Sequence, residues 1–536
     1  MTTMTPARPP GIRAGHDPLA HQLRAEWTKF RTVRGWVIGL IAGAIVTVAW
    51  GLLVANGGST ACQPNPAGPV LSGAACLPHV PLGPGGEAVT DSFYLARRPL
   101  PGDGSITVRV TSLTGRYSAG GIAPGPDPQA RFARGLQPWS KAGIIIKASA
   151  RPGSAYAAMM VTGGHGVRMQ YDFTHDTAGL AGNVSAGSPR WLRLTRSGDT
   201  LTGYDSADGR HWTTVGTTRL AGLPATVQAG LFAASPDHAT VVSASLGGGT
   251  STGGPSLATA AFDRIRLSGA GPGAPAGGWH GGVVGHSGEL PAAASGWRRT
   301  GGGLSVTGTG DIAPVVTGPD ASAIGQYLTG AFAGLIAAIV IAAMLSTTEY
   351  RRGLIRMTLA ASPRRGRTLA AKAIVAGAVT FAAGLAAAAV VVPLAGRLAR
   401  AKGSYVLPVS GLSSLRMIVG TAAVLAVAAV LAVALGTILR RSAAAVATGI
   451  AVIVLPYVLS TTAVLPVGVA GWLLRLTPAA AFAIQQSTPA YPQVTASYTP
   501  EAGYFPLAPW AGFAVLCGYA AVALAVAWYL LRRRDV

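Results

Sequence analysis

Residues 328–372 read LTGAFAGLIAAIVIAAMLSTTEYRRGLIRMTLAASPRRGRTLAAK, an apolar run followed by a strongly basic segment. The run 328–346 carries no charged residue and is long enough to cross a bilayer, which takes about 20 residues. The basic segment then places seven Lys and Arg residues before the next apolar run begins. This alternation predicts two membrane-spanning helices joined by a short basic loop.

Five further apolar runs have the same character, which brings the predicted number of spans to six. The whole chain is 49% hydrophobic and only 11% charged, whereas an ordinary soluble protein carries about 25% charged residues. The first run is longer than the 7–15 residue core of a signal peptide, so we expect it to remain as a span. The five runs are 36–55, 373–396, 417–438, 442–464 and 511–531.

Lys and Arg residues beside the spans predict the orientation of the chain, because they collect on the cytoplasmic side. Basic groups precede the first span, fill the loop 347–372, and follow the fourth and sixth spans. We therefore expect both termini in the cytoplasm. One group disagrees and would lie outside: Arg397, Arg400, Lys402 and Arg416.

Residues 57–325 then form one large insertion outside the membrane. Short runs alternate polar and apolar residues within it, as at Ile106, Val108 and Val110, and turn residues such as Gly198 and Gly209 separate them. Many short strands between Gly and Asp turns predict an all-β sandwich. The expected fold class is a polytopic helical membrane protein with an inserted jelly-roll sandwich. Its expected parts are a cytoplasmic N-terminus 1–35, span 36–55, linker 56–87, sandwich 88–268, linker 269–327, span 328–346, cytoplasmic loop 347–372, remaining spans 373–531 and tail 532–536.

The basic loop has two physical interpretations. Leu354, Ile355 and Leu359 give one face of a short helix that Pro363 would end, and such a helix can dock a partner protein. Alternatively, the loop only fixes topology and touches lipid headgroups.

The run TEYRRGLIRMTLAASPRRGRTLAAK, 348–372, resembles the first cytoplasmic loop of type-2 ABC exporter permeases. The resemblance implies that the loop holds a coupling helix that contacts a separate ATPase subunit. The residues it assigns to docking are Glu349, Tyr350, Arg351, Arg352, Gly353, Leu354, Ile355, Arg356, Leu359, Pro363, Arg364 and Arg365.

The run LRAEWTKFRTVRGW, 23–36, resembles the entry segment of the same family. It mixes aromatic and basic residues as interfacial helices do, and the resemblance implies an elbow helix along the inner membrane face. A simple positive flank is the alternative. The elbow residues are Leu23, Glu26, Trp27, Lys29, Phe30, Arg31 and Arg34.

Three runs of the insertion, PWSKAGIIIKAS, YAAMMVTGGHGVRMQYD and PRWLRLTRSGDTLTGYDSADGRHWTTVG, resemble concanavalin-like, laminin-G-like domains. Such domains often bind glycans, and others only bind protein or act as spacers. Trp139, Tyr171 and Trp212 are candidates for stacking on sugar rings, although aromatic residues at alternating strand positions usually pack inward. A glycan or another envelope ligand is therefore an expected partner of this domain.

Motifs for catalysis and metal binding are missing from the sequence. There is no G-x-x-x-x-G-K-[ST] loop, so we expect ATP and magnesium to bind a partner chain and this chain to have no cofactor or enzymatic activity of its own. No His and Cys cluster has zinc spacing, and Asp199, Asp205 and Asp208 fit turns better than a metal site. Cys62 and Cys76 lie outside the membrane, where a disulfide is plausible and two free thiols remain the alternative.

The expected function is that of a permease subunit in the bacterial plasma membrane, which moves a substrate with energy from a separate ABC ATPase. Its expected partners are that ATPase, a second identical or different permease, and the lipid membrane. The net charge of +23 flanks apolar runs, so nucleic acid is not an expected partner. Two alternatives are a wall-binding or glycan-binding anchor and an ABC complex that transmits force to envelope proteins.

Overall fold

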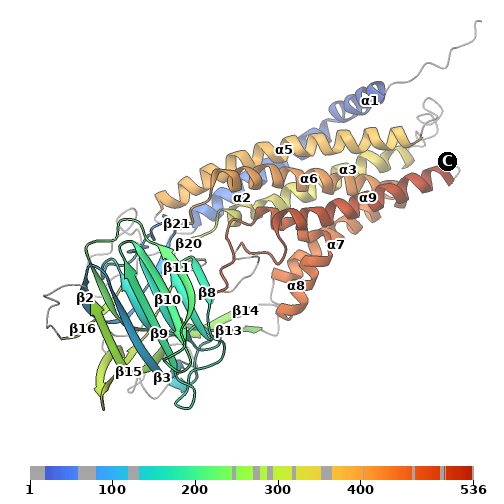
Figure 1. Cartoon of the computed structure of the whole chain (residues 1–536). Helices are drawn as coiled ribbons and strands as arrows, with labels where there is room; N and C mark the ends of the chain where they lie inside the picture. Colours follow the sequence, from blue (N-terminus) through green and yellow to red (C-terminus); the bar gives the residue numbers. More distant parts are fainter. Residues whose placement is uncertain are drawn as a thin grey trace, which may run out of the picture.

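The structure is a computed structural model that describes residues 19–57, 80–118, 132–243, 249–269, 278–285, 294–316, 321–351, 365–402, 404–461, 465–494, 500 and 503–533. It combines a long bundle of helices with a β-sandwich at one end of the bundle (Figure 1). The other end, where α1 and the end of α9 lie, is called the basal end below. The helices are α1 Leu19–Thr32, α2 Arg34–Gly57, η4 Ile324–Gly330, α3 Ala331–Arg351, α5 Arg365–Ala401, α6 Gly411–Leu439, α7 Ser442–Thr461, α8 Val467–Leu476, η5 Pro478–Gln485 and α9 Pro509–Arg533.

Six helices in the described part of the chain are long and apolar enough to cross a membrane: α2, the continuous η4 and α3, α5, α6, α7 and α9. Together with the sandwich inserted between the first two of them, they confirm the predicted fold class. The buried side chains of α3 and α6 meet those of α7, η5 and α9 in one apolar core. Large apolar side chains on α2 and α9, such as Ile38 and Val522, remain exposed because the lipid covers them.

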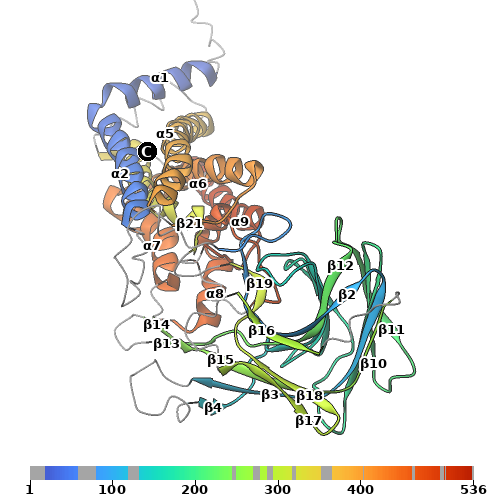
Figure 2. The ribbon, with the colours of Figure 1, turned by 90° about the vertical axis from the view of Figure 1, so that its left-hand side faces the viewer.

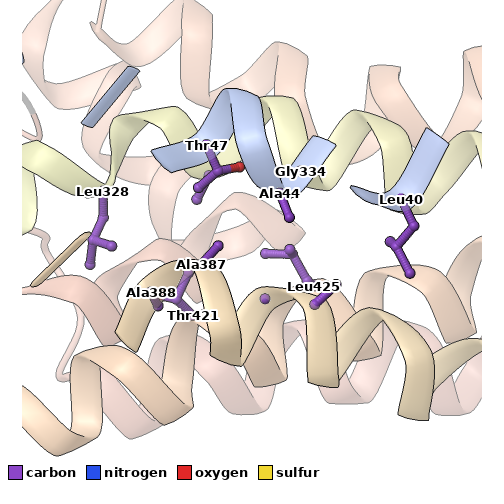
Figure 3. Close-up of a pocket in the computed structure, with 12 residues that line it drawn as sticks. Leu40, Ala44, Thr47, Leu328, Gly334, Ala387, Ala388, Thr421 and Leu425 are labelled. Carbon is purple, nitrogen blue, oxygen red and sulfur yellow. The ribbon is translucent and has the colours of Figure 1, made fainter. Parts of the chain in front are cut away.

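Helix α2 approaches its neighbours through small residues. Its buried positions recur every four residues, at Gly43, Thr47, Gly51 and Ala55. A Cβ atom on Gly51 would lie 2.7 Å from the carbonyl oxygen of Tyr327, so only glycine allows this approach. Figure 3 shows the small apolar cavity left where this face of α2 meets α3, α5 and α6.

The sandwich consists of two antiparallel sheets. The larger has the order β11–β10–β9–β3–β15–β18–β17, with β4 paired to β3, and the smaller has the order β16–β2–β12–β5–β6–β7–β8. The larger sheet contains β3 Gly104–Ser118, β4 Phe132–Arg134, β9 Arg190–Ser197, β10 Thr200–Ser206, β11 Thr213–Arg219, β15 Ser256–Gly269, β17 Gly296–Thr300 and β18 Gly303–Gly308. The smaller contains β2 Phe93–Pro101, β5 Lys141–Lys147, β6 Tyr156–Thr162, β7 Val167–Tyr171, β8 His175–Ala178, β12 Thr226–Ala234 and β16 His280–Val284.

Residue alternation builds the core between the sheets. On β9, Leu192 and Leu194 are fully buried, whereas Trp191 and Arg193, which precede them in turn, are only partly covered. Side chains from both sheets fill the core in this way. Three short pairs lie outside the two sheets: β1 Val89–Asp91 with β19 Ile312–Pro314, β13 His238–Ser243 with β14 Gly249–Gly254, and β20 Ala321–Ser322 with β21 Tyr405–Val406.

The segment 269–327, expected as a linker, instead contains β16 to β20 and η4. The Gly-, Ala- and Pro-rich composition of this segment did not predict these strands, because backbone pairing needs no particular side chain. Strand β16 has the sequence HGGVV and still pairs with β2, while β18 buries Leu304 and Val306 in the core.

Two buried ion pairs attach the entry and exit strands of the sandwich to its smaller sheet. Lys147 Nζ lies 2.7 Å from Asp91 Oδ2, and neither side chain is exposed. Lys141 Nζ lies 2.7 Å from Asp311 Oδ1 and donates to the carbonyl oxygen of Ile312. Burial raises the pKa of Asp91 and lowers the pKa of Lys147. The attraction between the two charges shifts both pKa values in the opposite direction but is the smaller effect. Strands β1 and β19, which lead from and to the membrane helices, therefore cover the outer face of β5.

The sandwich also joins the bundle directly. Strand β20 runs just before η4 and pairs in parallel with β21, which lies between α5 and α6. Gln493, before α9, donates to the carbonyl oxygens of Phe173 and Thr174 in the sandwich. Strands β16 and β19 lie on the side of the sandwich nearer the helices (Figure 2). The turn between β7 and β8 of the smaller sheet is thus tied to the segment before α9, and the segment that follows the sandwich is tied to the connection between α5 and α6.

Replacing Lys147 with Met should release β1 and β19 from the sheet, because the buried carboxylate of Asp91 would lose its counter-charge. Removal of one partner of a buried pair costs about 3–5 kcal/mol. Amide hydrogen exchange in the full-length protein should therefore accelerate by roughly 100-fold or more at residues 89–91 and 312–313. The control is Arg109→Met, which breaks the partly exposed Arg109–Asp263 pair and should cost at most about 1 kcal/mol. Equal effects of the two changes would contradict the proposed role of the buried pair.

Candidate functional site: an ion network at the basal end

Three helices meet at the basal end around the predicted cytoplasmic loop. Helix α3 continues to Arg351 and α5 begins at Arg365, so these two helices flank residues 352–364, which lie outside the described part of the chain. Helix α1 lies at the same end (Figure 1). Its Phe30 packs with Ile341 of α3 and with Val375 and Val379 of α5.

Four charged side chains from these helices form one network. Lys29 Nζ of α1 lies 2.8 Å from Glu26 Oε1 and 2.8 Å from Glu349 Oε1 of α3. Lys372 Nζ of α5 lies 2.6 Å from Glu349 Oε1 and 3.1 Å from Glu26 Oε2. Each ammonium therefore contacts both carboxylates, and the network joins α1, α3 and α5.

The network is neutral and largely buried. The side chains of Glu26, Glu349 and Lys372 are at most 8% exposed, whereas that of Lys29 is 41% exposed. Burial disfavours the charged form of Lys29, but its hydrogen bonds and attraction to the two carboxylates outweigh this effect and raise its pKa above the ordinary value. Lys29 therefore stays charged at neutral pH, and two positive charges balance two negative ones.

The structure places the predicted elbow residues on two helices. Leu23 and Phe30 pack in the apolar cluster beneath α1, Glu26 and Lys29 belong to the network, and Trp27 is exposed and stacked on Phe30. Arg31 lies in the last turn of α1, and Arg34 is the first residue of α2. Buried and exposed residues thus follow the amphipathic pattern of an interfacial helix.

The predicted docking residues fall into two groups. Glu349, Tyr350 and Arg351 lie in α3, and Arg365 lies in α5, where its Nη1 donates to the carbonyl oxygen of Leu531. The buried carboxylate of Glu349 points into the network. The remaining predicted residues lie outside the described residues: Arg352, Gly353, Leu354, Ile355, Arg356, Leu359, Pro363 and Arg364.

Sequence reasoning missed the pairing of Lys372 with Glu26 and Glu349. The sequence did hold a signal for this pairing. Within residues 18–56 and 326–500, the only acidic residues are Glu26 and Glu349. So few carboxylates beside many basic residues at the ends of apolar runs indicate that each has a specific partner.

A lateral groove lies nearer the sandwich, between α2, η4, α3 and α7. Its volume is about 700 Å³, within the range of small-molecule sites. Trp50, Phe332 and Tyr457 give it an aromatic wall, and Gln326 and Thr461 add polar groups.

Each predicted sugar-stacking aromatic residue is covered on one side of its ring by a neighbour. Trp139 stacks with His165 at 4.0 Å, Tyr171 stacks with His175 at 4.3 Å, and the guanidinium of Arg193 lies 3.9 Å from the ring of Trp212. Trp139 is also buried.

The sequence also raised a disulfide and a metal site. Cys62 and Cys76 lie outside the described residues. Within the described ranges, no group of three or more His, Cys, Asp or Glu side chains is arranged to hold a metal ion.

Replacing Lys372 with Met should loosen α1, because Glu26 and Glu349 would then share only Lys29. The expected cost is about 3–5 kcal/mol, and amide exchange in residues 19–32 should accelerate accordingly. Lys402→Met, an exposed lysine just after α5, is the matched control. The double variant Lys372→Met/Glu349→Gln should recover part of the loss, since no surplus carboxylate remains. If α1 exchanges at the wild-type rate in Lys372→Met, the network does not hold this helix.

A comparison with protein families covers the chain from the sandwich to its C-terminus. The sequence model of the family described as "ABC-2 family transporter protein" matches residues 170–536, more than half of the chain. The search of curated proteins gave no match.

Solved structures show only distant likeness. A functionally unknown protein from Saccharomyces cerevisiae is 16% identical, with 34% of this chain and 74% of that chain covered and a TM-score of 0.17. A variant of the GH43 protein BlXynB from Bacillus licheniformis is 16% identical over 31% of this chain and 27% of that chain, with a TM-score of 0.18. Scytalido-glutamic peptidase bound to a peptide-based transition-state analogue is 6% identical over 42% of this chain and 100% of that chain, with a TM-score of 0.22.

TM-scores this low carry no argument about function. The family match over more than half of the chain, with which six apolar helices agree, shows that the chain belongs to the ABC-2 family of transporter membrane proteins.

Proposed function

We propose that this chain is the membrane-spanning permease subunit of an ATP-driven exporter, whose ATP and magnesium are bound by a separate ATPase subunit. The observation that carries the proposal is the ion network, because it joins α1 to both helices that flank residues 352–364. A partner that pushed on this loop and on α1 would therefore move α3 and α5 together. In this proposal the basal end is cytoplasmic, the sandwich lies outside the bacterial plasma membrane, and both termini are inside.

The permease would transmit this movement along α3. Helix α3 continues into η4, and η4 is preceded by β20, which pairs with β21 between α5 and α6. A shift at the basal end therefore reaches the connections beneath the sandwich through a continuous helix and a backbone pair. We propose that two such permeases, identical or different, form the transport path.

The lateral groove is the proposed place of the substrate. An aromatic wall with a few polar groups suits an amphipathic molecule, whose apolar part would contact Trp50 and Phe332 and whose polar part would reach Gln326. The groove lies in the half of the bundle nearer the sandwich, so a molecule leaving it would emerge beside that domain.

A second candidate function is the transmission of force to envelope proteins, and the buried Lys–Asp pairs favour it. They attach the sandwich to its entry and exit strands, so movements of η4 would also move the sandwich. The concanavalin-like or laminin-G-like identity of this domain and its role as a glycan-binding or wall-binding module remain proposals. The covered rings of Trp139, Tyr171 and Trp212 leave at most one face of each for a ligand.

Replacing Leu354 and Leu359 with Asp should abolish copurification of the ATPase subunit, because charges would replace the proposed apolar docking face. The measurement is the amount of ATPase retained by the tagged full-length permease. Leu412→Asp is the control, since Leu412 is exposed at the start of α6, away from the basal end. Unchanged retention of the ATPase by the Leu354→Asp/Leu359→Asp variant would refute the docking assignment.

A companion variant separates docking from transmission. Glu349→Gln should leave ATPase retention within about twofold of wild type, because its carboxylate is buried in the network. Substrate-stimulated ATPase activity in vesicles should fall by roughly tenfold or more, a loss of about 1.4 kcal/mol in coupling. Full stimulation in this variant would argue against the network as the transmitting element.

A further inference from the structure

The larger sheet of the sandwich presents a polar outer face that neither the proposed ATPase docking nor the lateral groove uses. Its strands β10, β11, β17 and β18 lie on the side of the sandwich farther from the helices (Figure 2). The smaller sheet differs, because β1 and β19 cover part of its outer face and Gln493 ties it to the bundle. Side chains on the outer face of the larger sheet are therefore the ones placed to meet a partner beyond the bundle.

Directly paired residues form a row of hydroxyl groups across this face, and five neighbouring strands contribute one side chain each. From β11 through β10, β9 and β3 to β15, the row consists of Thr217, Thr202, Thr195, Ser105 and Ser268. Their chain neighbours Leu194 and Ile106 point into the core, so the row points outward. Strands lie about 4.8 Å apart, so the row is on the order of 20 Å long. Each hydroxyl can donate one hydrogen bond and accept two.

A second row, displaced by two residues along the strands, carries positive charge. Arg193 of β9 and Arg266 of β15 lie in it on either side of Thr107. Arg193 Nε donates to Thr107 Oγ1 at 3.3 Å, and the guanidinium lies 3.9 Å from the ring of Trp212. Arg266 is exposed. Two strand spacings, about 10 Å, separate the backbones at the two arginines, so the charges are spread along the hydroxyl row.

Positive charge on this face exceeds negative charge. Asp263 is the only acidic side chain that the described strands place on it, and Arg109 pairs with that carboxylate. Three further carboxylates lie in turns at the ends of the sheet and accept backbone hydrogen bonds there: Asp103, Asp199 and Asp208. Four arginines on the face have no carboxylate partner among the described residues: Arg193, Arg219, Arg266 and Arg298. Threonine suits any exposed strand, so the unbalanced arginines are what indicates an anionic ligand.

We propose that this face binds an anionic glycan of the cell envelope, whose chain lies across the strands along the hydroxyl row. The guanidiniums of Arg193 and Arg266 would donate to carboxylate or phosphate groups of the glycan, which arginine binds well. The hydroxyls of the row would exchange hydrogen bonds with sugar hydroxyls. A polyanion without sugars would engage the arginines but leave this row unmatched. The inference rests on the proposed position of the sandwich outside the membrane.

The test measures binding of labelled polymers to the purified full-length protein in zwitterionic nanodiscs by fluorescence anisotropy. Polygalacturonate, an anionic glycan, should bind at least about tenfold more tightly than neutral dextran. The variant Arg193→Gln/Arg266→Gln should weaken polygalacturonate binding by about tenfold. Its matched control is Arg97→Gln/Arg151→Gln, which removes the same charge from β2 and the turn after β5 in the smaller sheet.

A second variant tests the hydroxyl row without changing any charge. Thr195→Val/Thr202→Val should weaken polygalacturonate binding by roughly threefold to tenfold, because two hydrogen-bonding groups are lost. Binding of polyglutamate, an anionic polymer without sugar hydroxyls, should stay within about twofold in this variant.

Three outcomes would overturn the proposal. Equal weakening by the two double arginine variants would show general charge attraction. Equal binding of dextran and polygalacturonate would show that anionic groups are not selected. Equal binding of polyglutamate and polygalacturonate by the wild-type protein would assign the face to polyanions without regard to sugar. Arg266→Gln alone carries the test if Arg193→Gln lowers the thermal stability of the protein, because Arg266 is exposed.

A labelling experiment separates failure of this inference from failure of the proposed function. Thr217→Cys should add labelling by a membrane-impermeant maleimide in intact cells, compared with the wild-type protein, because Thr217 is exposed on this face. Such labelling without glycan binding would overturn the glycan site and leave the permease proposal standing. Labelling only after permeabilisation would contradict the proposed orientation of the whole chain.

Discussion

The need to neutralise charge in a low-dielectric environment governs the basal end of this protein. A carboxylate or an ammonium buried beside hydrocarbon costs several kcal/mol unless a counter-charge contacts it. Glu349 and Lys372 lie near the ends of two membrane helices and pair with each other, and α1 adds Glu26 and Lys29 to the same place. The position of α1 against α3 and α5 depends on this arrangement.

The same constraint operates at the other end of the molecule. Lys141 and Lys147 are completely buried on one strand. Their partners are Asp311, just before the strand β19 through which the chain leaves the sandwich, and Asp91, on the strand β1 through which it enters. The ion pairs therefore act on the connections between domains. Because β20 and η4 follow directly, α3 is held by charge at its basal end and by the sandwich at the other. A helix fixed at both ends is well suited to carry a movement between them.

Packing between the helices follows a different rule, because lipid offers no hydrophobic driving force for their association. Close contact of α2 with α3 relies on Gly43, and its close contact with η4 and α5 relies on Gly51, because small residues let backbones approach. Large aromatic residues, Trp50, Phe332 and Tyr457, line the lateral groove. Helix α2 thus carries both a close contact built on small residues and one wall of an open groove.

The sequence alone determined the membrane spans, the inserted β-domain and the basic loop, because apolar length, strand alternation and charge beside a span are properties of neighbouring residues. The amphipathic character of residues 23–36 was also visible in this way. The sequence did not reveal the strands in 269–327, because Gly-rich segments can pair through their backbones without the alternation of polar and apolar residues that indicates a strand. Only the tertiary structure decided which charges meet: Lys29 and Glu349 are 320 positions apart, and Glu26 and Lys372 are 346 apart. Such partners are selected by the packing of α1 across α3 and α5, and no local pattern in the chain encodes that contact.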